Sequence, residues 1–91
     1  MTDNQRVERI RAALEAALAP SALDISDDSA AHAGHAGALT GKGHFSVRIV
    51  AERFAGLPPL KRHRLVYAAL ETLLETDIHA LSIDARAPQE G

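Results

Sequence analysis

Residues 44–67 restrict the fold more than any other segment, because a strand pattern, a proline corner and a helix start follow one another in HFSVRIVAERFAGLPPLKRHRLVY. From Phe45 to Ile49 every second residue is apolar, which predicts a strand with one buried face. Pro58 and Pro59 suit the pre-helical and first helical positions. Apolar residues then recur with a helical period: Val66, Leu70 and Leu73. This segment therefore predicts a strand and a helix that share one core.

The N-terminal segment predicts another amphipathic helix. Its apolar residues are spaced by three or four positions: Val7, Ile10, Leu14 and Leu18. Thr2 and Asp3 are suitable caps for its start, and Pro20 ends it.

Two further strands complete the expected order of helix, strand, strand, helix, strand. Residues 22–26 alternate and predict a short strand, and residues 78–85 predict the last one, in which His79 shares a face with Leu81 and Ile83. The helix between them is expected to end at about residue 75 or 76. Adjacent strands can pair antiparallel, and a strand reached through a helix lies parallel to a neighbour. We therefore expect an α+β fold, a three-stranded mixed sheet with two helices on one face.

The chain of 91 residues is expected to form one domain, residues 1–91. Residues 27–43 are rich in alanine and glycine without periodicity, which predicts a flexible loop. Residues 88–91 are expected to form a frayed tail.

The composition excludes several classes of function. The chain has no cysteine, so it has no thiol nucleophile and cannot hold an iron–sulfur cluster or a cysteine-type zinc site alone. Its formal charge of −2 gives no overall attraction to nucleic acid or to an acidic membrane. No apolar run suits a signal peptide or a membrane span, and no catalytic constellation is recognisable. We therefore expect a cytoplasmic protein that is not an enzyme.

A basic cluster begins the second helix. Lys61, Arg62 and Arg64 lie near the positive end of the helix dipole, where each cation is unfavourable by about 0.3–1 kcal/mol. A phosphate backbone would compensate for this charge, and Arg53 is a further candidate for the same nucleic-acid surface. The alternative is a solvated face, or pairing with acidic residues of the same domain.

The five histidines are candidate metal ligands of unequal quality. His63 falls on the apolar stripe of the second helix, which indicates a structural role, and His44 precedes the central strand and is expected to fix its start. His32 and His35 lie in the alanine- and glycine-rich loop, where they are either solvated or able to reach another molecule's metal. His79 begins the last strand, where the residues alone favour a structural role.

Several motifs together resemble the BolA family. They are His44-Phe45-x-Val47-x-Ile49-Val50, Phe54-x-Gly56, Arg62-His63-Arg64-x-Val66-Tyr67 and Ile78-His79-Ala80-Leu81. The resemblance extends from the first helix to about Pro88, and it implies a K-homology-like fold of the second topology.

The resemblance also implies a function. BolA-like proteins pair with monothiol glutaredoxins, which supply sulfur ligands together with glutathione, and the partners share a 2Fe-2S cluster. His79 matches the family's C-terminal histidine ligand, and the second ligand comes from the loop, where His35 is favoured and His32 is the alternative. DNA-binding regulation is a second role attributed to the family, which makes DNA the second candidate partner.

Overall fold

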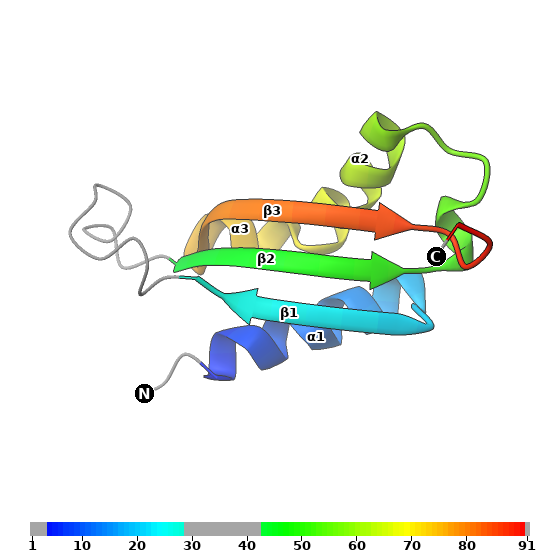
Figure 1. The fold of residues 1–91 in the computed structure, drawn as a ribbon. Coiled ribbons are helices and arrows are strands. Elements are labelled where there is room, and N and C mark those ends of the chain that lie inside the picture. The colour runs from blue at the N-terminus through cyan, green and yellow to red at the C-terminus, as the bar shows by residue number, and fades with distance from the viewer. Residues whose placement is uncertain (1–3, 29–42, 91) are drawn as a thin grey trace.

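The computed structural model describes residues 4–28 and 43–90 of the chain. Their elements follow in the order α1 (Asn4–Leu18), β1 (Ala22–Asp27), β2 (Gly43–Val50), the short 3-10 helix η3 (Glu52–Phe54), α2 (Pro59–Ala69), α3 (Glu71–Thr76) and β3 (Ile78–Arg86). The strands form one sheet in the order β1-β2-β3, in which β1 is antiparallel and β3 parallel to β2. The helices α1, α2 and α3 lie on one face of this sheet (Figure 1). The predicted α+β fold with a three-stranded mixed sheet is confirmed.

Helix α1 packs through the apolar stripe that the sequence predicts. Ile10, Leu14 and Leu18 are at most 3% exposed. The helix ends at Leu18, and the next residue, Ala19, has a positive φ of 47° just before Pro20. The predicted caps Thr2 and Asp3 lie outside the described residues.

Strand β2 is the centre of the sheet and of the core. Phe45, Val47 and Ile49 are at most 2% exposed, as the alternation predicts. They belong to one core cluster with residues of α1, of η3 and of the segment from α2 to its junction with α3: Ile10, Leu14, Leu18, Phe54, Val66 and Leu70. Because β2 pairs on both sides, its side chains have well-defined positions.

The corner before α2 forms as predicted. Pro58 has the extended conformation (φ −71°, ψ 162°), and Pro59 is the first helical residue. Gly56 has a φ of +77°, which side chains other than glycine rarely adopt. This glycine allows the chain to turn from η3 into α2.

The predicted second helix is in fact two helices that meet at Leu70. The Leu70 amide donates to the carbonyls of both Val66 (3.1 Å) and Tyr67 (3.2 Å), and its φ and ψ of −106° and 14° are not helical. The tightened turn keeps Leu70 fully buried while the chain changes direction into α3. The expectation of one continuous helix is therefore wrong.

The first residues of β3 also differ from the prediction. Gly43 pairs with Ile78 and His44 with Ala80, so the register shifts between the two pairs and His79 is an additional residue on β3. Ile78 is 2% exposed and belongs to the core, whereas His79 is exposed. The expected face shared by His79, Leu81 and Ile83 is wrong, because this irregularity interrupts the alternation.

Residues 88–90 of the expected tail are described, and Gly91 lies outside the described residues. Residues 88–90 form a turn, and the Glu90 carboxylate accepts hydrogen bonds from Arg62 and from the Ala87 amide.

Among the described helices, none is long and apolar enough to cross a membrane.

Candidate functional sites at the two ends of the sheet

His79 lies beside His44 at the end of the sheet where β2 and β3 begin. The centroids of the two rings are 5.2 Å apart, and their planes are tilted by 51°. His44 is half-buried on the central strand, and His79 is exposed. At the irregular start of β3, the imidazole of His79 is therefore exposed to solvent and contacts the half-buried imidazole of His44.

Backbone and side-chain bonds fix this end of the sheet. The Gly43 amide donates to the Asp77 carbonyl (2.9 Å), and the Asp28 amide donates to the His44 carbonyl (2.7 Å). Arg9 Nε on α1 donates to Asp77 Oδ2 (2.9 Å), and the Asp77 side chain is only 13% exposed. The start of β3 is thus held by both α1 and β2.

The same bonds place the two residues that flank the predicted histidine loop, Asp28 and Gly43, close to His44 and His79. Residues 29–42, which include His32 and His35, lie outside the described residues, but Asp28 precedes them and Gly43 follows them. Both of these flanking residues bond to the neighbourhood of His44 and His79. An exposed imidazole therefore lies beside both ends of the segment that contains His32 and His35.

The described residues contain no cluster of three or more histidine, aspartate or glutamate side chains that could hold a metal ion, so His79 is not part of such a cluster within them. His63, which the sequence assigns a structural role, is half-buried on α2.

Arg62, predicted to bind nucleic acid, has a side chain that is only 13% exposed. Its Nε donates to the Leu57 carbonyl (2.7 Å), and one Nη donates to the Ala85 carbonyl (3.1 Å). Both Nη atoms also donate to the Glu90 carboxylate at 2.6 Å. Arg62 thus joins α2 to the end of β3 and to the tail.

This pairing perturbs both partners. The hydrogen bond from Arg62, aided by one from the Ala87 amide, lowers the pKa of Glu90 from 4.5 to about 2. The hydrogen bond to Glu90 raises the pKa of the Arg62 guanidinium. Arg62 is therefore paired with a carboxylate of the same domain, Glu90. Pairing with acidic residues of the domain is the alternative to nucleic-acid binding that the sequence left open.

The other basic candidates differ in whether their side chains bond to the rest of the domain. Arg53 donates to the Ala17 carbonyl (3.3 Å) in the last turn of α1, where a cation is favourable. Lys61 and Arg64 are exposed, and no hydrogen bond or ion pair of their side chains is found within the described residues. Lys61 and Arg64 are thus the basic candidates without a bonded partner among the described residues, whereas Arg62 and the exposed Arg53 bond to other parts of the domain.

The two candidate sites lie at opposite ends of β3. His79 is near its start, whereas Arg62 contacts Ala85 near its end. The strand between these two positions spans roughly 20 Å, at about 3.3 Å per residue. Among the residues that the structure describes, His79 and the basic candidates therefore do not lie in one site.

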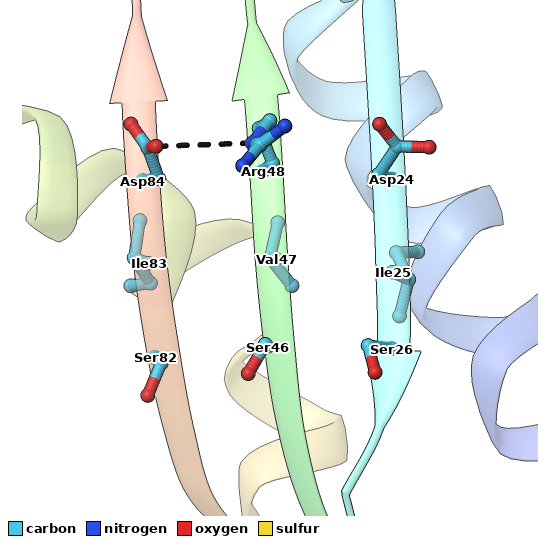
Figure 2. Close-up of a pocket in the computed structure, with 9 residues that line it drawn as sticks. All are labelled: Asp24, Ile25, Ser26, Ser46, Val47, Arg48, Ser82, Ile83 and Asp84. Atoms are coloured by element: carbon cyan, nitrogen blue, oxygen red, sulfur yellow. Dashed lines mark ion pairs between the residues drawn. The ribbon is translucent and has the colours of Figure 1, made fainter.

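The open face of the sheet carries a hollow that the sequence reasoning missed. It has a volume of about 340 Å³, and Figure 2 shows three rows of side chains that cross the three strands. They are a serine row (Ser26, Ser46, Ser82), a charged row (Asp24, Arg48, Asp84) and, between them, an aliphatic row (Ile25, Val47, Ile83). The guanidinium of Arg48 lies 3.9 Å from the Asp84 carboxylate. The available signal for this hollow in the sequence was the occurrence of polar residues at alternate positions of the strands. Which of these residues lie side by side depends on the register between strands, which only the fold shows.

Comparisons with known proteins give one consistent result. A family model described as BolA-like protein matches residues 14–90. Human BolA-like protein 1 is 48% identical over 81 residues, which cover 89% of this chain and 57% of that protein. The DNA-binding transcriptional regulator BolA of Escherichia coli (strain K12) is 41% identical over 76 residues, covering 84% of this chain and 70% of the regulator.

The solved structures agree with the sequence relatives. The BolA domain of SufE1 from Arabidopsis thaliana has a TM-score of 0.82 and 43% identity, with 94% of this chain and 95% of that domain covered. Two Arabidopsis relatives are named as chloroplastic and as chloroplastic/mitochondrial. The chain spans little more than half the length of the mammalian relatives, 57% for the human protein.

Proposed function

Because this chain belongs to the BolA-like protein family, we propose that it is a non-catalytic iron–sulfur accessory protein that binds a monothiol glutaredoxin. The two proteins would share a 2Fe-2S cluster, for cluster trafficking or iron sensing. The glutaredoxin and its glutathione supply the sulfur ligands, and this chain supplies histidine. A cytoplasmic location is part of the proposal, and the cysteine-free composition is compatible with a reducing compartment.

The observation that carries the proposal is the exposed His79 beside both ends of the segment that contains His32 and His35. A chain without cysteine can contribute to such a cluster only nitrogen or oxygen ligands. Histidine in place of thiolate leaves less negative charge on a cluster and raises its reduction potential. Ligation also requires a neutral imidazole, so acid favours release.

The test is to titrate the purified protein into a glutaredoxin that carries its cluster and to follow visible absorption and circular dichroism. We expect a new spectrum with the parent chain and none with His79→Ala. His63→Ala, on α2, is the matched control and should behave as the parent. An unchanged spectrum with the parent, or the same new spectrum with His79→Ala, would contradict the proposal.

The loop ligand can be assigned in the same experiment. We expect His35→Ala to weaken the new spectrum and His32→Ala to leave it intact, because His35 is the better match by its spacing from His44. The reverse result would assign the role to His32.

DNA binding is the second candidate function, and Lys61 and Arg64 are the observation that favours it. Both are exposed in the first two turns of α2. One relative at 41% identity is named as a DNA-binding transcriptional regulator.

The DNA proposal predicts a salt-dependent affinity that these two residues control. Replacing both Lys61 and Arg64 by alanine should reduce the slope of log K against log salt by about 0.9 for each phosphate that the variant no longer neutralises. Arg48→Ala, on the open face of the sheet, serves as the control for a simple loss of charge. Equal affinity and slope for the parent and the Lys61/Arg64 variant would show that this surface does not bind DNA.

A further inference from the structure

We infer that His44 is a positioning residue that holds the imidazole of His79 in one orientation. This inference rests on the proposed function of His79 as a ligand and adds a residue to it. The two rings are 5.2 Å apart between centroids and tilted by 51°, within the range of favourable ring contacts. His79 is exposed, and the contact with His44 is the side-chain interaction that the described residues provide for it.

His44 is suited to this role because its own position is well fixed. It lies on β2, which pairs with both neighbouring strands, and its side chain is half-buried. Its carbonyl accepts a hydrogen bond from the Asp28 amide at 2.7 Å. His79, by contrast, is the additional residue in the irregular start of β3. The well-fixed ring of His44 therefore contacts the ring of His79, whose backbone lies outside the regular pairing of β2 with β3.

The physical effect of this support is preorganisation. An exposed histidine samples several rotamers, and a ligand must adopt one of them to bind iron. Immobilising such a side chain in advance is worth about two- to tenfold in affinity. The ring of His44 provides this effect through contact, so its nitrogen atoms are not required.

Two variants of His44 separate positioning from ligation. His44→Ala removes the ring contact, whereas His44→Phe keeps a ring and removes both nitrogen atoms. If His44 positions His79, the phenylalanine variant resembles the parent and only the alanine variant differs. If His44 were itself a ligand, both variants would fail equally, which would overturn the inference.

The first measurement uses the full chain without a partner or cluster. NMR spectra of the His79 ring should show contacts to the ring of residue 44 and one dominant side-chain rotamer in the parent and in His44→Phe. His44→Ala should show shifted ring signals and averaged rotamers, in a protein whose core signals are unchanged. Identical His79 ring signals in all three proteins would overturn the inference, whatever the function of His79.

The second measurement uses the complex with a monothiol glutaredoxin and its cluster. We expect His44→Ala to lose the cluster about two- to tenfold faster than the parent and His44→Phe to match the parent. Equal cluster lifetimes for the parent and His44→Ala would overturn the inference and leave the proposed function intact. Failure of the parent itself to form the complex would overturn the proposed function and, with it, the role of His44 toward iron.

Discussion

Arg62 lies among three acceptors that come from separate parts of the chain. Leu57 precedes α2, Ala85 is near the end of β3, and Glu90 is in the C-terminal turn. In the sequence, Arg62 is one of three cations in a helix start, and nothing distinguishes it from Lys61 or Arg64. Its partner Glu90 is 28 residues away. Local spacing identified the basic cluster, but only the fold shows which member is structural.

Glu90 gives this contact a predictable pH dependence. Its pKa is lowered from 4.5 to about 2 in the folded protein, so the ionised form stabilises the fold above pH 4.5. That contribution declines as the pH falls from about 5 toward 2. We predict that Glu90→Gln is less stable than the parent at pH 6 and that most of this difference is lost by pH 2.

Thermal unfolding of the two proteins between pH 2 and 7 checks this prediction. Glu75→Gln, at an exposed position on α3, is the control for the loss of one carboxylate. A difference between the parent and Glu90→Gln that stays constant over the whole pH range would contradict it.

At the scale of elements, regular patterns were predicted correctly and their interruptions were not. Two apolar patterns each predicted a continuous buried face: the alternation from Phe45 to Ile49 and the helical stripe from Ile10 to Leu18. The break at Leu70 lies inside an uninterrupted apolar pattern with no proline or glycine, so no local signal marks it. The shifted register at His79 depends on how β3 pairs with β2, which is a long-range property.

The turn into α2 depends on Gly56, whose φ is +77°. An added Cβ would meet no atom within 4 Å, so the effect of a substitution there is conformational rather than steric. We predict that Gly56→Ala lowers the free energy of unfolding by about 1–2 kcal/mol. Gly56→Asn should lower it by less, because asparagine tolerates this region better.

Chemical denaturation of the parent and both variants measures these differences. Ala55→Gly, at the preceding turn position with a negative φ of −59°, is a control for glycine entropy alone. Equal stability of the parent and Gly56→Ala would show that the turn does not need this conformation.

At the scale of the whole molecule, the sheet separates the two proposed functions. The histidine end contains His79 and His44, and the basic end contains Lys61 and Arg64, with roughly 20 Å of strand between them. The sequence predicted both sets of residues, but it could not show that they lie at opposite ends.

This separation predicts that each function can be lost alone. His79→Ala should abolish cluster sharing and leave DNA affinity unchanged, whereas the Lys61/Arg64 double alanine variant should do the reverse. Both assays on both variants, with the parent alongside, check the prediction. A variant that loses both activities while its thermal unfolding matches the parent would show that the two ends are coupled.

The proposal is that His79 coordinates the shared cluster through its imidazole. Pulsed electron paramagnetic resonance of the reduced complex with a monothiol glutaredoxin tests it most directly. The protein is labelled with 15N-histidine, and the glutaredoxin is left unlabelled, so that any 15N coupling to the cluster comes from this chain. We predict a 15N coupling of directly bound imidazole in the parent complex and its loss or reduction with His79→Ala. A parent complex without 15N coupling, or a coupling that His79→Ala leaves unchanged, would contradict the account.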